Sequence, residues 1–151
     1  GKARTVPVSH DRLDWLDTAW YRDNLETIIG ICRQHHIQPI FITQPDTWLT
    51  KDTLVLNYHW MFGRGGVAYE KPLLHQKLVE LNEIMKEVAL ANNIPCFDAA
   101  AALPPDSSAF YDDCHLNPNG SKLMAKLLAK YILHNHLLDT PLSTPLNSIN
   151  N

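Results

Sequence analysis

The sequence has no excess of positive charge and no long run of apolar residues. Its 151 residues carry 13 Lys and Arg against 16 Asp and Glu, which gives a formal net charge of -3. A chain without a basic field has nothing to hold a phosphate backbone, so we expect no nucleic-acid partner. No apolar run approaches the roughly 18 residues that cross a bilayer, so we expect no membrane span in this chain.

Cysteine is also scarce, and the three thiols form no recognisable framework. Cys32 and Cys96 fall in apolar patterns, where a thiol acts as a small hydrophobe. Cys114 stands beside His115, but neighbours in an extended segment point to opposite faces, which makes a nucleophilic Cys/His pair unfavourable. Zinc sites need about four ligands at characteristic spacings, and no such pattern is present. We expect neither a disulfide framework nor a metal site.

Apolar residues recur with helical periodicity in three stretches, and two short apolar runs lie between them. In the first stretch, Leu25, Ile28, Ile29 and Cys32 share one helical face. The runs QPIFIT and IPCFDA are typical of short buried strands. The sequence therefore predicts helix, strand, helix, strand and helix, over residues 18–36, 38–43, 71–93, 94–99 and 118–136.

The order of these elements predicts an α/β fold. A strand, a crossover helix and a second strand form a parallel pair, which has to be covered on both faces. Two strands make a thin core, so the pattern is typical of the second part of a larger α/β sheet. We expect residues 1–138 to belong to one domain and residues 139–151 to form a loosely held tail. The sequence leaves the localisation open, because an upstream export signal or anchor can be missing from it.

Polar residues gather where the two predicted strands end. Thr43, Gln44 and Asp46 follow the first strand, and a segment ending at His115 follows the second. Ligands of open α/β sheets bind at the carboxyl ends of the strands, so we expect an active site at this edge.

The stretch FYDDCHLNPNG places Asp112 three residues before His115. A carboxylate at this position can accept the Nδ1 proton of the histidine and leave Nε2 free as a general base. Asn117 is a good N-cap and Pro118 a good first helical residue, so the start of the helix should fix this loop. The alternative is that Asp112 and Asp113 are solvated loop acids, since a bare D-x-x-H match often arises by chance.

Residues 24–132 resemble the C-terminal half of the SGNH (GDSL-type) hydrolases. Their final D-x-x-H-x-N-x-x-G block is matched by Asp112, His115, Asn117 and Gly120. The resemblance implies a flavodoxin-like three-layer α/β/α sandwich with a parallel sheet, and an esterase that uses a Ser-His-Asp triad. It assigns the orienting role to Asp112 and the acid-base role to His115. It implies a small-molecule or sugar ester as substrate and no cofactor.

The family's G-D-S block, which carries the nucleophile, and its oxyanion blocks are absent from this sequence. Ser9 is the serine nearest the N-terminus, but it follows no predicted strand. We therefore expect the nucleophilic serine on an N-terminal half of the same domain, outside this chain. The alternative is a non-catalytic glycan- or protein-binding module on an SGNH-like fold that has lost its nucleophile.

A long connection rich in aromatic residues joins the first strand to the second long helix. Trp48 and Trp60 lie on it, and Gln44 stands just before it. We predict that these three side chains bind substrate, because long connections at this edge often form lids or pocket walls. The alternative is that the aromatic residues only cover the edge of the core. We expect His59 and His75 to be polar surface residues.

Overall fold

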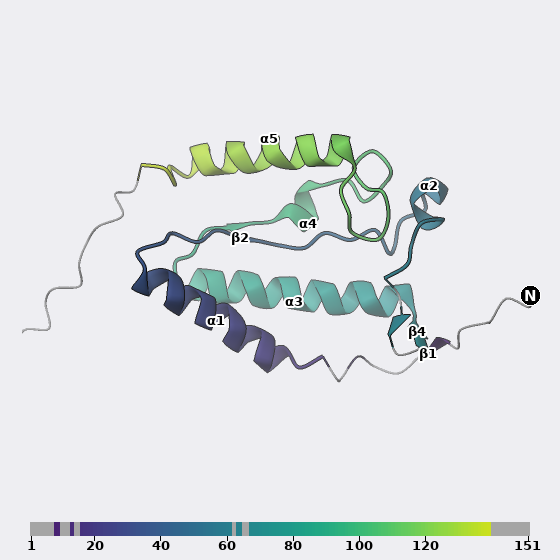
Figure 1. Cartoon of the computed structure of the whole chain (residues 1–151), viewed down its shortest axis with the longest axis horizontal. Coiled ribbons are helices and arrows are strands. Elements are labelled where there is room, and N and C mark those ends of the chain that lie inside the picture. The colour runs from purple at the N-terminus through teal and green to yellow at the C-terminus, as the bar shows by residue number, and fades with distance from the viewer. Residues whose placement is uncertain (1–7, 10–12, 14–15, 62, 65–66, 140–151) are drawn as a thin grey trace, which may run out of the picture.

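The computed structural model describes residues 8–9, 13, 16–61, 63–64 and 67–139. These residues form a mixed α/β fold (Figure 1). The elements are β1 (Val8–Ser9), α1 (Thr18–Gln34), β2 (Phe41–Ile42), α2 (Thr53–Leu56), β3 (Gly63–Arg64), β4 (Val67–Tyr69), α3 (Lys71–Ala91), β5 (Cys96–Phe97), α4 (Ala99–Ala102) and α5 (Pro118–His134). No helix in this part of the chain is long and apolar enough to cross a membrane.

Strands β2 and β5 pair in parallel, as the strand-helix-strand order predicts. Phe41 lies opposite Cys96, and Ile42 lies opposite Phe97. Each strand is only two residues long, shorter than the apolar run that predicted it. Helix α3 connects the two strands, and α1 packs against α3.

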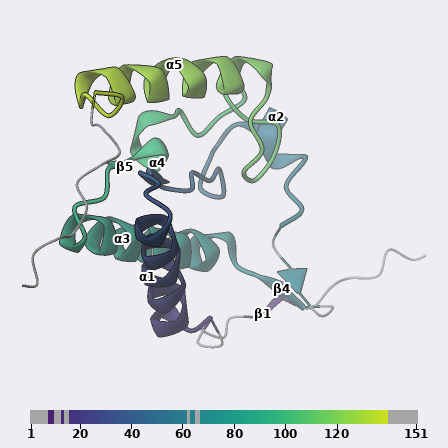
Figure 2. The ribbon, with the colours of Figure 1, turned by 60° about the vertical axis from the view of Figure 1, so that its left-hand side comes forward.

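Helices lie on both sides of the β2–β5 pair. Helices α1 and α3 lie on one side and α5 lies on the other, an arrangement seen from two directions (Figures 1 and 2). On the α1–α3 side, the core is built from buried Leu25, Ile29, Phe41, Val88 and Ala89. On the α5 side, the rings of Phe97 and Tyr131 are in contact, with centroids 5.4 Å apart.

The three long helices start where the sequence predicts and end two residues earlier. After the last turn of each helix, one residue has the left-handed conformation. These residues are His36, Asn93 and His136, with φ of 56°, 56° and 53°. The next backbone N–H then bonds to a carbonyl five residues back, as from Ile94 to Ala89 at 2.8 Å. This is a Schellman motif, which satisfies the last carbonyls of a helix.

The long connection after β2 has more structure than the sequence predicts. It contains the short helix α2, and β3 and β4 form an antiparallel pair. Strand β1 adds to β4 in parallel, with Ser9 opposite Tyr69, so that a second, three-stranded sheet forms near the start of α3, away from the β2–β5 pair (Figure 1). The sequence predicts no strand near Ser9, whereas the structure places Ser9 as the second residue of β1. The predicted tail lies outside the described residues, except for residue 139.

The start of α5 is fixed against the loop that precedes it. Asn117 caps the helix by accepting the backbone N–H of Gly120 at 2.8 Å, which confirms the predicted cap. Gly120 is buried so closely against this loop that a Cβ there would overlap the carbonyl oxygen of Ala109. A second core cluster of Leu103, Ala109 and Phe110 packs beneath, against residues of α5. The loop of residues 110–116 therefore has a rigid base.

Candidate active site

The DxxH loop is a tight turn held by its own first aspartate. The Oδ1 atom of Asp112 accepts the backbone N–H of Cys114 at 3.1 Å and that of His115 at 2.9 Å. The backbone N–H of Tyr111 bonds to the carbonyl oxygen of His115 at 2.9 Å and closes the turn. Aspartate favours such turns because its side chain can bond the backbone two residues on.

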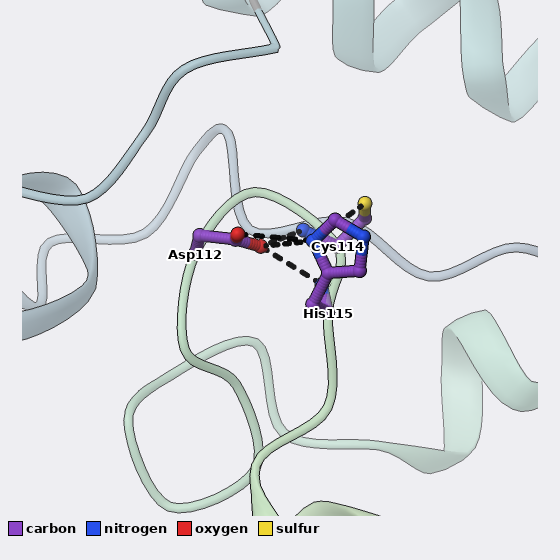
Figure 3. A group of neighbouring side chains, drawn as sticks. All are labelled: Asp112, Cys114 and His115. Carbon is purple, nitrogen blue, oxygen red and sulfur yellow. Dashed lines mark hydrogen bonds and ion pairs between the residues drawn. The ribbon is translucent and has the colours of Figure 1, made fainter.

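Asp112 and His115 form a hydrogen-bonded pair. The Nδ1 atom of His115 lies 2.9 Å from Oδ2 and 3.0 Å from Oδ1 of Asp112. The other ring nitrogen points away from the carboxylate (Figure 3). A carboxylate only accepts, so Nδ1 carries a proton and Nε2 of the neutral ring is an acceptor. The contact expected from the spacing is present, and the catalytic role of the pair stays a prediction.

The environment of Asp112 keeps it ionised. Burial raises the pKa of this carboxyl, but hydrogen bonds outweigh burial and lower the pKa to about 2. The donors are the backbone N–H groups of His115 and Cys114, the His115 ring and the Trp60 indole. Hydrogen bonds to the charged form of a carboxyl stabilise that form. At neutral pH, Asp112 is therefore an anion facing His115.

Trp60 contacts both members of the pair. Its indole Nε1–H donates to Oδ2 of Asp112 at 3.0 Å. Its ring is stacked with the imidazole of His115, with the planes 3° apart and the centroids separated by 6.1 Å. The sequence predicts a substrate-binding role for Trp60, but its contacts with Asp112 and His115 were not foreseen.

Asp113 is fully buried and faces away from His115. Its carboxylate accepts the backbone N–H groups of Trp60 at 2.6 Å and Met61 at 2.9 Å, and the indole N–H of Trp48 at 3.0 Å. The alternative that Asp113 is a solvated loop acid is therefore wrong. Its negative charge is matched by donors from a segment about 50 residues earlier in the chain.

His59 is buried beneath this loop, so its prediction as a surface residue is wrong. Its Nε2 lies 3.0 Å from the hydroxyl of Thr47, and its Nδ1 lies 3.6 Å from Oδ1 of Asp113. Burial lowers the pKa of His59, although Asp113 acts in the opposite direction. The hydroxyl of Thr47 donates to the backbone carbonyl of Asp112 at 2.7 Å. Thr47, His59 and Asp113 thus form a buried cluster that contacts the backbone of Asp112.

A cleft of about 530 Å³ opens beside Asp112, and His115 is not among the residues that line it. Its lining is mostly apolar and aromatic and contains no Lys or Arg: Leu54, Tyr58, Trp60, Ser107, Phe110, Tyr111, Asp112 and Asn117. Of the three predicted substrate-binding residues, only Trp60 lines it.

The other two predicted substrate-binding residues make contacts within the fold. The indole of Trp48 donates to the buried Asp113. The backbone N–H and carbonyl of Gln44 bond to the side chain of Asn82 on α3, both at 2.9 Å. His75, predicted to be a surface residue, is partly exposed and lies 2.9 Å from Asp46. These contacts join the connection to α3 and to the DxxH loop.

Asp112, Cys114 and His115 each place one potential metal ligand within 4.8 Å of the others (Figure 3). The Sγ atom of Cys114 lies 3.2 Å from Sδ of Met61 and 3.9 Å from Nδ1 of His115. Burial and the charges of nearby aspartates raise the pKa of this thiol, which disfavours the thiolate. A metal bound at Nδ1 would replace the proton shared with Asp112, so metal binding through this nitrogen would break the hydrogen-bonded pair.

Serines near the cleft are engaged elsewhere. Ser107 lines the cleft, but its backbone N–H and hydroxyl both bond to Asp52. The hydroxyl of Ser108 donates to Asp106 at 2.5 Å. Neither contact provides a nucleophile for His115.

Comparison with protein-family models, with curated proteins and with solved structures finds no match for this chain.

Proposed function

We propose that this chain is the C-terminal part of an SGNH-type ester hydrolase. The observation that carries the proposal is the contact between Asp112 and His115, with Nδ1 held by the carboxylate and Nε2 free. This is the geometry of an acid-base pair that activates a hydroxyl nucleophile. In the proposed enzyme, Asp112 orients the ring and His115 transfers the proton.

The nucleophile of the proposed reaction is a serine on an N-terminal segment of the same domain. Its Oγ attacks the ester carbonyl while Nε2 of His115 takes the hydroxyl proton. The imidazolium then gives this proton to the departing alcohol, which leaves an acyl-enzyme. Water, deprotonated by His115, attacks the acyl-enzyme and releases the carboxylic acid and the serine. Asp112 remains ionised throughout, because its pKa lies near 2.

The proposed complete fold is a flavodoxin-like three-layer sandwich. The parallel β2–β5 pair with helices on both sides is compatible with the C-terminal part of such a sheet. Within the described residues, β2 and β5 pair only with each other, so each has one edge without a strand. Open edges present unpaired backbone groups, to which an N-terminal strand can add.

The cleft supports an uncharged ester as substrate. Its exposed apolar side chains offer surfaces on which an acyl chain or a sugar ring can pack. Its charged lining residue is Asp112, an anion, which disfavours an anionic group beside it. We propose a small acyl or sugar ester.

The same cleft favours a second candidate function, a non-catalytic module that binds a glycan or a protein. Leu54, Tyr58, Trp60 and Tyr111 line it and are 57–69% exposed, and exposed aromatic and apolar side chains are typical of binding surfaces. Under this alternative, the Asp112–His115 pair is a structural remnant.

The test is to produce the chain with and without its upstream coding segment. We expect the 151-residue chain alone to hydrolyse no aryl acetate above background and to resist a serine-directed fluorophosphonate. With the upstream segment, in cis or as a separate fragment, both hydrolysis and labelling should appear, with the label on a serine of that segment. A longer protein that is folded but neither labelled nor active would favour the binding module. Labelling of Ser9 in the isolated chain would contradict the proposed position of the nucleophile.

A further inference from the structure

Trp60 holds the Asp112–His115 pair from one side. It donates a hydrogen bond to the carboxylate and stacks on the imidazole, so one side chain restrains both partners. The indole N–H engages Oδ2, while the backbone N–H groups of the turn engage Oδ1. Together these donors fix the rotation of the carboxylate, which leaves both oxygens within 3.0 Å of Nδ1.

Trp60 is itself held by the second aspartate of the DD pair. The carboxylate of Asp113 accepts the backbone N–H groups of Trp60 and Met61 and has no exposed surface. A buried carboxylate is stable only when donors compensate it, so these hydrogen bonds are costly to lose. Asp113 directly follows Asp112, so these hydrogen bonds hold the segment that carries Trp60 against the DxxH loop.

Thr47 and His59 provide a second set of contacts between Asp113 and Asp112. His59 lies between Asp113 and the Thr47 hydroxyl, which donates to the backbone carbonyl of Asp112. Of the described side chains, His59 has a buried ring nitrogen, Nδ1, without a hydrogen-bond partner. The Nδ1 atom lies 3.6 Å from Oδ1 of Asp113, so His59 also faces the Asp113 carboxylate.

We propose that Trp60 is a positioning residue of the dyad, and that the buried Asp113 acts on His115 through it. The proposal rests on the proposed function for its catalytic meaning, but the arrangement is measurable without any substrate. Trp60 limits the rotation of Asp112 and of the His115 ring, so that Nε2 keeps one direction. Because Trp60 also lines the cleft, a bound substrate touches the same side chain that orients the base.

The first test uses Trp60→Phe, which keeps an aromatic ring and removes the indole donor. Trp60 is exposed, so this variant should fold. NMR titration of the Asp112 carboxyl carbon in the 151-residue chain should show its pKa raised by about 0.5–1 unit, since a donor to the charged form is lost. The matched control is Trp20→Phe, an exposed tryptophan on α1, a helix that contributes no residue to the lining of the cleft. It should leave the Asp112 pKa unchanged.

The second test uses Asp113→Asn in the same chain. With weaker acceptors for its backbone, Trp60 should move away from Asp112, and its indole proton should shift upfield. The Asp112 pKa should rise, as it does in Trp60→Phe. If Asp113→Asn does not fold, Trp60→Phe alone decides the result.

An Asp112 pKa in Trp60→Phe equal to that of the unaltered chain overturns the positioning role. A raised pKa in a protein whose longer form hydrolyses no ester keeps the positioning role and overturns the proposed function. The two proposals can therefore fail separately.

Discussion

Asp112 and Asp113 are adjacent in the chain, and their carboxylates bind the same tryptophan from two sides. Asp112 accepts the indole N–H of Trp60 at 3.0 Å, and Asp113 accepts its backbone N–H at 2.6 Å. One carboxylate faces the imidazole of His115, and the other is buried with no exposed surface. The two acids should therefore respond differently to substitution.

Asp112 should make stability depend on pH in the acid range. Its pKa is about 2 in the folded chain and 3.8 in the reference state, so it contributes stability above pH 3.8 that is lost as pH falls toward 2. The contribution is about 2 kcal/mol. Urea unfolding between pH 6 and pH 2 should show the chain more stable than Asp112→Asn at pH 6, with the difference closing near pH 2. A difference that is the same at pH 6 and pH 2 would exclude this linkage.

Asp113→Asn should destabilise the fold strongly. The carboxylate accepts N–H groups of Trp48, Trp60 and Met61, and an asparagine amide has only one acceptor oxygen for these donors. We expect the free energy of unfolding to fall by about 2–4 kcal/mol. The matched control is Asp139→Asn, whose side chain is 73% exposed. It should change stability by less than about 0.5 kcal/mol. Equal effects in the two variants would contradict the role given to Asp113.

Two glycines should respond to alanine in opposite directions. In Gly120→Ala the new Cβ overlaps the Ala109 carbonyl, so α5 or the DxxH loop has to move, at a cost of about 2–3 kcal/mol. In Gly30→Ala the Cβ meets nothing within 4 Å inside helix α1, so stability should rise by about 0.5–1 kcal/mol. Thermal unfolding of both variants measures the contrast. A tolerated Gly120→Ala would show that the loop is not packed against α5.

The thiol of Cys114 should react slowly with alkylating agents and should have no catalytic role. Burial and the charges of Asp112, Asp113 and Asp46 raise its pKa, so iodoacetamide at pH 7 should alkylate it more slowly than a free thiol. Cys114→Ala in the longer protein should keep ester hydrolysis within about threefold. Rapid alkylation at pH 7, or loss of activity in Cys114→Ala, would point to a thiol nucleophile instead.

The sequence predicted the long helices from their periodicity and the strands β2 and β5 from short apolar runs, and it missed the short elements outside such patterns. Helices α1, α3 and α5 have apolar stripes, with a capping side chain before α1 and α5 and a proline in the first turn of α3 and α5, so their first residues follow from the pattern. Their ends were predicted two residues too late, because the apolar pattern runs into the last turn and a histidine at the left-handed position, His36 or His136, does not signal a helix end. Asn93 is a residue that often takes this conformation, but the pattern alone does not fix at which residue the helix stops. Strands β1, β3 and β4 are two or three residues long, too short for an alternation to be recognised.

The candidate site was predicted in part for the same reason. Asp112 and His115 are three residues apart, and a local turn brings them together. The contacts of Trp60 and the burial of Asp113 depend on residues about 50 positions apart meeting in space. His59 shows no sequence feature that separates a buried histidine from an exposed one.

The central claim is that His115 is the general base of an ester hydrolase, and the turnover of His115→Ala tests it most directly. The measurement is kcat on an aryl acetate, made in the protein that includes the upstream segment. The matched control is His136→Ala, which removes the histidine of an exposed Asp–His pair, with Nδ1 3.0 Å from Asp139. We expect kcat to fall on the order of 10³-fold or more in His115→Ala and to stay unchanged in His136→Ala. Full activity in a folded His115→Ala protein would contradict the central claim.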